Sequence, residues 1–327
     1  MRSRNVLAML PLAAGLLHQG AHSLATSGPV AGTTARSTAA KGTGAAKEFS
    51  LPLDTLRDWA KTVVVDLEGV KIEGNSAVHP LEDDCEMHFG AHTDAFQGSP
   101  NGLVLEPMNA CVEDPPDPFA SWSAFAKSIK NKKVTASGVP RIWPEHLEGG
   151  SASNPDHAAE LHPLTGIVNG TESFDFSANV FAGEYHGKDG NRNIAERVDV
   201  SVTSSSGTVD LSFRGGQIGN FTTVELRIDR ASITSDGAGS FRMDGDAVMD
   251  DATRVPVRIV TVKGSPINDA MPGIKRRSGA THTIQSALVL HSLNIEALLD
   301  AANRSRGRTV KVDRPVQYIL YGPTDSE

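Results

Sequence analysis

The chain has 327 residues, and 31 Lys and Arg against 39 Asp and Glu give it a formal net charge of −8. Its two cysteines are too few for a zinc ribbon or a disulfide-dense mini-domain, and the acidic balance argues against a general nucleic-acid binder. The length is enough for two ordinary domains, each with a hydrophobic core.

The first 25 residues have the layout of a secretory signal peptide. Arg2 and Arg4 precede a mostly apolar run over residues 6–17, and Ser23 to Ala25 form a small-x-small cleavage pattern. The apolar run is shorter than the roughly 20 residues that a membrane-spanning helix needs. The sequence therefore predicts a secreted or periplasmic protein with a signal peptide over residues 1–25 and no membrane span.

The segment over residues 26–50 is rich in Ala, Gly, Ser and Thr. Such a composition buries too little apolar surface to order itself, so we interpret the segment as a disordered linker. The composition changes where the linker ends. We expect a first domain over residues 51–168 and a second over residues 169–327.

The first domain shows strand and helix patterns in an order that is typical of one small barrel. The predicted strands cover residues 62–72, 84–91, 103–106, 133–142 and 157–168. Asp117 and Pro118 suit the N-cap and first position of a helix, which apolar residues at helical spacing then continue. Three strands, a helix and two strands are the order of the OB fold. The sequence therefore predicts an OB-like five-stranded β-barrel with one helix.

The two cysteines fit this arrangement. If the second and third strands form a hairpin that turns near residues 97–99, Cys85 lies opposite residues 109–113, which include Cys111. In an oxidising compartment the expected state is a Cys85–Cys111 disulfide. Two buried free thiols and metal ligation are the alternatives.

The second domain is predicted to be β-rich with one helix, as a sandwich or barrel of the α+β kind. Strand-like runs cover residues 173–182, 197–203, 208–214, 221–229, 240–243, 256–263, 308–313 and 316–321. Asn294 can cap a helix that Gly307 ends. We interpret residues 264–281, which contain Pro, Gly and the basic triplet 275–277, as a loop.

Six of the 11 histidines fall between residues 79 and 162, in a region that is also rich in carboxylates. They are His79, His88, His92, His146, His157 and His162. Neutral imidazole and carboxylate are usual ligands of zinc, so a metal site is one interpretation. The alternatives are histidines that hold strand ends through ring N–H groups, and histidines that transfer protons or bind a ligand.

The spacing of these histidines limits which of them can share an ion. On one strand His88 and His92 lie about 13 Å apart unless Gly90 bends the chain. His157 and His162 have opposite strand parity, so we expect their side chains to point apart. Spacing does not decide whether His88 and His162 meet, because the second and fifth strands of such a barrel need not be adjacent.

Two short motifs add a resemblance. Asp84-Cys85-Glu86-Met87-His88 and Glu160-Leu161-His162-Pro163-Leu164 resemble a pattern in uncharacterised secreted proteins of bacteria. The resemblance implies an OB-like barrel and an extracytoplasmic bacterial origin, and it implies no established activity. Because it centres on them, the candidate binding residues are His88, His162, Glu86 and Glu160.

Charge and missing motifs shape the functional prediction. Residues 61–168 hold 7 Lys and Arg against 16 Asp and Glu, a formal charge of −9 that repels nucleic-acid phosphates. The chain has no G-x-S-x-G, P-loop or H-E-x-x-H motif, so no enzyme class is favoured. We expect a non-enzymatic binding or structural module of the cell envelope, with a protein or carbohydrate partner and no cofactor. The alternative is a metal-binding protein or metal-dependent hydrolase that uses His88, His162 and nearby carboxylates.

Overall fold

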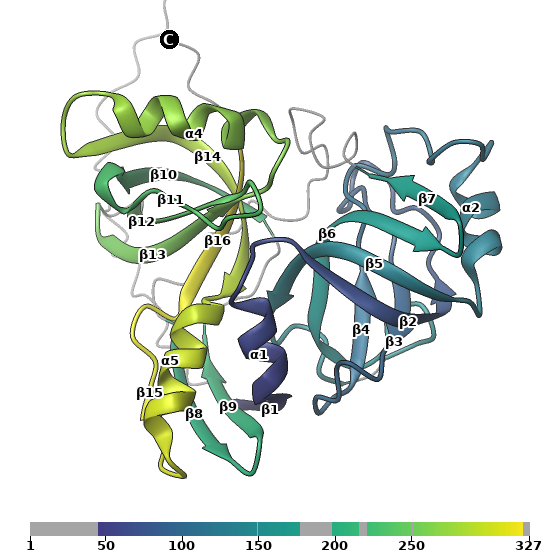
Figure 1. Cartoon of the computed structure of the whole chain (residues 1–327), viewed down its shortest axis with the longest axis horizontal. Coiled ribbons are helices and arrows are strands. Elements are labelled where there is room, and N and C mark those ends of the chain that lie inside the picture. The colour runs from purple at the N-terminus through teal and green to yellow at the C-terminus, as the bar shows by residue number, and fades with distance from the viewer. Residues whose placement is uncertain (1–44, 149, 177–197, 216–220, 250–251, 323–327) are drawn as a thin grey trace, which may run out of the picture. The chain divides into compact units, whose positions relative to one another are not determined.

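The structure is a computed structural model that describes residues 45–148, 150–176, 198–215, 221–249 and 252–322. These residues are mainly β, with two closed five-stranded barrels and four α-helices, which confirms the predicted fold class (Figure 1). No helix among them is long and apolar enough to cross a membrane. The predicted signal peptide and residues 26–44 of the predicted linker lie outside the described residues.

The first barrel contains five strands and the helix α2, in the predicted order. They are β2 (Val65–Asn75), β3 (Phe89–His92), β4 (Gly102–Leu105), α2 (Trp122–Ile129), β5 (Lys133–Ile142) and β6 (His157–Asn169). The strands pair in the order β2-β3-β4-β6-β5, and β5 closes the barrel on β2. The pair of β4 and β6 is parallel and the others are antiparallel. A short strand, β7 (Glu172–Asp175), extends the sheet beyond β6.

Two local features of the first barrel differ from the prediction. Helix α2 is capped by Ser121, whose side chain accepts a hydrogen bond from the Ala124 N–H, and not by Asp117. The strand predicted from residue 84 begins only at Phe89, because Cys85 has a φ of 58° and interrupts the extended backbone. The buried residues Glu86 and His88 therefore lie in the loop before β3 and not within a strand.

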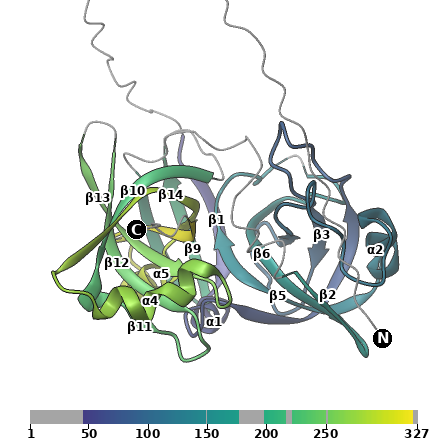
Figure 2. The ribbon, with the colours of Figure 1, turned by 90° about the horizontal axis from the view of Figure 1, so that it is seen from above.

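The second barrel closes in the same order as the first. It consists of β10 (Phe221–Asp229), β12 (Phe241–Val248), β13 (Arg254–Thr261), β14 (Thr281–Leu293) and β16 (Val316–Gly322). In each barrel the first strand pairs with the second and fourth, and the third and fifth strands are parallel. Each also has a helix between its third and fourth strands (Figure 2). The amino-acid sequence contains no internal repeat that predicts this common topology.

The helix of the second barrel corrects the prediction of a loop over residues 264–281. Helix α4 covers Pro266–Arg276, with Ser265 as its N-cap and Pro266 in its first turn. Ile267, Met271 and Ile274 are buried in the core of the second barrel, and this burial stabilises a helix that contains Pro272. The short helix η1 (Arg230–Ser232) and β11 (Thr234–Ser235) follow β10.

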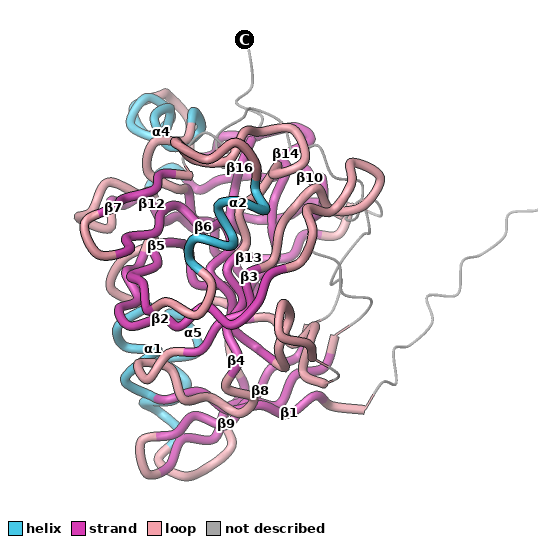
Figure 3. Tube along the Cα trace, turned by 90° about the vertical axis from the view of Figure 1, so that its right-hand side faces the viewer, coloured by secondary structure: helices cyan, strands magenta, loops and turns pink. Residues whose placement is uncertain are grey.

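A separate four-stranded sheet collects segments from distant parts of the chain. Its strands are β1 (Lys47–Pro52), β9 (Thr208–Arg214), β8 (Asp199–Ser205) and β15 (Val310–Lys311), in that order. Helix α5 (Ile295–Ser305) packs against β8 and against α1 (Leu53–Trp59), and these two helices lie side by side in Figure 3. The predicted Asn294 cap is confirmed, since its side chain accepts from the Ala297 N–H.

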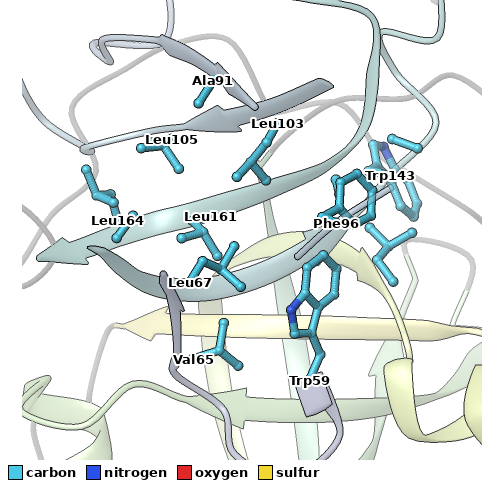
Figure 4. Packing of buried hydrophobic residues seen from close by; sticks show 14 of the residues in the cluster. Trp59, Val65, Leu67, Ala91, Phe96, Leu103, Leu105, Trp143, Leu161 and Leu164 are labelled. Carbon is cyan, nitrogen blue, oxygen red and sulfur yellow. The ribbon is translucent and has the colours of Figure 1, made fainter. Parts of the chain in front are cut away.

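The four-stranded sheet corrects the predicted end of the linker. Residues 47–50, which the sequence placed in the linker, belong to β1. Strands and helices on both sides of residue 168 contribute to one hydrophobic cluster, in which Trp59 of α1 stacks on Phe96 at 5.7 Å between ring centroids (Figure 4). The domain boundary at residues 168 and 169 stays a prediction.

The predicted disulfide between Cys85 and Cys111 is confirmed. It joins the loop before β3 to the segment after β4, across 26 residues of sequence. The loop that carries Asp84, Glu86 and His88 is thereby tied to the barrel at its middle.

Candidate functional site

Seven histidine, glutamate and aspartate side chains of the first barrel come together in one cluster. We call this set the His/carboxylate cluster: His79, Asp84, Glu86, His88, Glu106, Glu160 and His162. The first four belong to the loop between β2 and β3, Glu106 follows β4, and the last two lie in β6. They meet because β4 pairs with both β3 and β6, so that the loop, the end of β4 and β6 are neighbours.

His162 lies at the centre of the buried half of the cluster. Its Nε2 is 2.9 Å from Glu86 Oε1, and its Nδ1 contacts Glu106 and lies 3.6 Å from Glu160 Oε2. Burial by itself lowers the pKa of an imidazole, but the charges of Glu86 and Glu106 raise the pKa of His162 well above its usual value. The surrounding carboxyl groups therefore favour the protonated form of His162.

Glu160 is fixed on its other side by a cation. Arg141 Nη1 lies 2.5 Å from its Oε2, and His157 Nε2 lies 3.1 Å from its Oε1. Burial raises the pKa of a carboxyl, but the charge of Arg141 and the hydrogen bond from His157 hold the pKa of Glu160 well below the usual range. Glu160 thus stays ionised inside the protein.

The prediction that His157 and His162 point apart is wrong, because both contact Glu160. The pairing of β6 with β4 shifts between His157, opposite Gly102, and Ala159, opposite Leu103. This irregularity adds one residue to β6 and reverses the alternation of its side chains. Strand parity counted along the sequence therefore fails at this position.

Glu106 links the two candidate histidines that sequence spacing could not place. His88 Nε2 lies 3.4 Å from Glu106 Oε1, while the other oxygen of Glu106 contacts His162. Sequence reasoning missed Glu106 and Arg141. Glu106 follows a short strand and Arg141 lies within a strand, and no local sequence pattern identifies either residue as part of a site. His92, which was weighed as a partner of His88, contacts Glu73 at 3.0 Å instead.

Glu86 is fully buried and has an incomplete set of hydrogen bonds. Its Oε1 accepts from His162, but its Oε2 has no hydrogen-bond partner among the described residues. Burial raises the pKa of Glu86 to about 8. An unsatisfied buried carboxylate oxygen of this kind destabilises the fold unless a proton, water or ion reaches it.

The outer part of the cluster reaches the surface. His79 Nδ1 lies 2.7 Å from Asp84 Oδ1, Asp84 Oδ2 lies 4.0 Å from His88 Nε2, and the two imidazole rings meet edge to face at 4.6 Å. The His79 side chain is 25% exposed, whereas those of Asp84 and His88 are close to 10%. The hydrogen bond that His79 donates to Asp84 raises the pKa of His79. The outer part can therefore exchange a ligand with solvent.

Three overlapping groups of ligand atoms in the cluster each lie within 4.8 Å of one another. They are His79–Asp84–His88, Glu86–His88–Glu106 and Glu106–Glu160–His162. The third group already contacts a cation, because Arg141 pairs with Glu160. The first group combines two imidazoles, one carboxylate and access to solvent.

The predicted candidates His88, His162, Glu86 and Glu160 all lie in the cluster, but they do not form one metal group. His88 and Glu86 share a group, and His162 and Glu160 share another. Comparison of the chain with protein-family models, curated proteins and solved structures gives no match.

Proposed function

We propose that the protein binds a divalent transition-metal ion of the zinc class with His79, Asp84 and His88. One observation carries the proposal: two imidazole nitrogens and a carboxylate oxygen converge within 4.8 Å at the edge of the barrel. Two histidines and a carboxylate are a donor set that zinc and similar ions prefer, and they leave a coordination position open.

The distances are compatible with a tetrahedral ion. Bonds of about 2.0–2.1 Å to the metal place neighbouring ligand atoms about 3.3 Å apart. His79 Nδ1 lies 2.7 Å from Asp84 Oδ1, and His88 Nε2 lies 4.0 Å from the other oxygen of Asp84, distances on either side of this value. Glu106 Oε1 lies 3.4 Å from His88 Nε2 and is suited to orient this imidazole.

The surroundings favour the outer group over the inner ones. The cation of Arg141 lies against Glu160, so a metal ion at the Glu106–Glu160–His162 group meets a fixed positive charge. Glu160, His162 and Glu106 stand between Arg141 and His88 in the series of ion-pair contacts. The outer group is also the one that reaches solvent. Its loop is anchored by Cys85, which stands directly after Asp84 and forms the disulfide with Cys111.

The same proposal includes an OB-like classification and an extracytoplasmic location. The shared closing order and the helix between the third and fourth strands support the OB-like assignment of the first barrel. The disulfide supports a secreted or periplasmic location, since such bonds persist in oxidising compartments. A partner in the envelope and hydrolytic activity stay predictions.

Titration of the metal-free protein with zinc in a calorimeter tests the metal proposal. We expect one equivalent of zinc to bind the wild type, and His79→Asn and His88→Asn to weaken its affinity at least tenfold. His92→Asn is the matched control, because His92 lies four residues after His88 and, among the described residues, forms an ion pair only with Glu73. Its affinity should equal that of the wild type.

Two results would overturn the proposal. One is less than about 0.1 equivalent of bound zinc, cobalt or manganese in the wild type. The other is unchanged affinity in His79→Asn, whose partly exposed side chain can be replaced with little effect on folding. Circular dichroism of each variant shows whether lost binding reflects lost ligands or an unfolded chain.

A further inference from the structure

The second barrel contains a buried cation that plays no part in the metal site. Arg230, the first residue of η1, is 4% exposed. Its Nε and Nη2 atoms have no hydrogen-bond partner, and no carboxylate of the described residues forms an ion pair with it. A buried charge without a partner is costly, so the position calls for a group that neutralises it.

The two unpartnered atoms are the ones that matter for recognition. Nε–H and Nη2–H lie on one edge of the guanidinium and form the parallel pair of donors with which arginine holds an oxyanion. Both donors of this edge are free among the described residues. Both N–H donors on this edge of Arg230, which we call the fork, can therefore bind a group with two acceptor oxygens.

The loop between α4 and β14 lies over this pair of donors. The Arg230 N–H donates to the carbonyl of Ala280 at 3.1 Å, which places the loop between α4 and β14 over the arginine. A Cβ atom built on Gly279 would lie 2.9 Å from Nη2, and Gly279 has a φ of 91°. An exposed glycine without a side chain thus lies directly against this atom.

Three basic residues directly precede the same loop. Lys275, Arg276 and Arg277 form the exposed end of α4, directly before the loop. Lys275 Nζ donates to the carbonyl of Ile233, the residue that follows η1, at 2.8 Å. Lys275, within the stretch that the sequence predicted as a loop, therefore lies against the residue that ends the η1 turn, three positions after Arg230.

The carboxylate of the neighbouring Asp229 does not neutralise the charge of Arg230. Asp229 directly precedes it in the chain, but Asp229 Oδ1 accepts from the Ala231 N–H at 3.0 Å and caps η1. From the free fork, the glycine cover and the basic helix end, we propose that Arg230 is the centre of an oxyanion-binding site. Its ligand carries a phosphate, sulfate or carboxylate group.

Thermal unfolding of the full chain in inorganic phosphate, sulfate or acetate tests this site. Ionic strength is held constant with sodium chloride, so that only specific binding raises the melting temperature. We expect at least one anion to raise it saturably, and the anion with the largest shift identifies the ligand group. Arg230→Gln should abolish the shift. Arg57→Gln, at an exposed arginine of α1 paired with Asp54, is the matched control and should keep the shift in full.

A second variant and a direct signal keep the test independent of folding. Arg230→Lys retains the charge without the fork and should bind the anion about tenfold more weakly than the wild type. In the wild type, the ¹H–¹⁵N resonance of one arginine Nε–H should move saturably with the anion. No saturable shift with any of the three anions, or equal shifts in the wild type and Arg230→Gln, would overturn the proposal.

Discussion

Nε2 of His88 lies 3.4 Å from Oε1 of Glu106, and this contact joins the loop before β3 to the end of β4. The same glutamate contacts His162, so it connects the outer, partly exposed half of the His/carboxylate cluster to the buried half. We therefore expect metal binding at the outer half to be coupled to the stability of the barrel interior.

Replacing Glu106 tests this connection. We expect Glu106→Gln to weaken zinc binding about tenfold to a hundredfold, because it removes the charged carboxylate that contacts and orients the ligand His88. We also expect a lower free energy of unfolding in the metal-free protein, because His162 loses one of its carboxylates. Calorimetric titration and urea unfolding measure the two effects.

The control for this change is Glu73→Gln. Glu73 is a partly exposed glutamate that also contacts a histidine, His92, but belongs to none of the metal groups. It should leave zinc affinity unchanged. Equal zinc affinity in the wild type and Glu106→Gln would remove Glu106 from the site.

Arg141 is expected to be the most sensitive charged position of the first barrel. Arg141→Gln leaves Glu160 as a buried carboxylate without its arginine, and breaking a buried pair in this way costs about 3–5 kcal/mol. The exposed pair of Arg57 and Asp54 is the comparison, and Arg57→Gln should cost about 0.5 kcal/mol or less. Urea unfolding measures both. Similar losses at the two positions would contradict a structural role for the buried pair.

The stability of the metal-free protein should decline as the pH rises above about 4.5. The pKa of Glu86 is raised to about 8, so the unfolded chain releases this proton near pH 4.5 while the folded protein holds it until about pH 8. The unfolded state then binds fewer protons, and the free energy of unfolding falls with rising pH. His162, with its raised pKa, adds stability below pH 6.5 that is lost as the pH rises further.

At acidic pH the free energy of unfolding depends on pH with the opposite sign. The pKa of Glu160 is lowered, so its contribution is present above the usual value of 4.5 and is lost as the pH falls. Stability should therefore be highest in mildly acidic solution. Urea unfolding between pH 4 and 9 checks this profile, and Glu86→Gln should flatten the decline between about pH 4.5 and 8. A decline that is equally steep in this variant would show that Glu86 is not its source.

A close backbone approach sets the position of the segment before β6. A Cβ atom on Gly90 would meet the carbonyl oxygen of Ala152 and lie 2.9 Å from Pro155 Cδ. We expect Gly90→Ala to destabilise the protein by about 1–3 kcal/mol, because the segment over residues 151–156 has to move away from β3. Thermal unfolding measures the loss.

Gly273→Ala is the matched substitution for this measurement. Gly273 lies inside α4, and a Cβ atom there has no neighbour within 4 Å. Alanine should stabilise the helix by about 0.5–1 kcal/mol. If both alanine variants stabilise the protein, the segment does not rest on β3 as described.

Local patterns were sufficient for much of the first barrel and one helix of the second half. The alternating strand over Phe221–Asp229, Asn294 as a helix cap, the antiparallel pairing of β3 with β4 and the Cys85–Cys111 disulfide are confirmed, whereas the strand predicted from residue 84 begins only at Phe89. Helix α4 was missed because Pro272 and Gly273 disfavour a helix, although Ser265 and Pro266 are ordinary signals of a helix start. Burial of its apolar face against the second barrel outweighs the low propensity.

Local patterns in the amino-acid sequence predict the β-rich class, the strand and helix order of the first barrel, the favoured cysteine pairing and the residue types available for a site. The contact of His88 with Glu106, the sharing of Glu160 by His157 and His162, and the common closing order of the two barrels emerge only from the folded structure. Side-chain periodicity is a local property that a few neighbouring residues specify. Convergence of distant side chains depends on strand pairing and on an added residue in β6, and no local pattern encodes either.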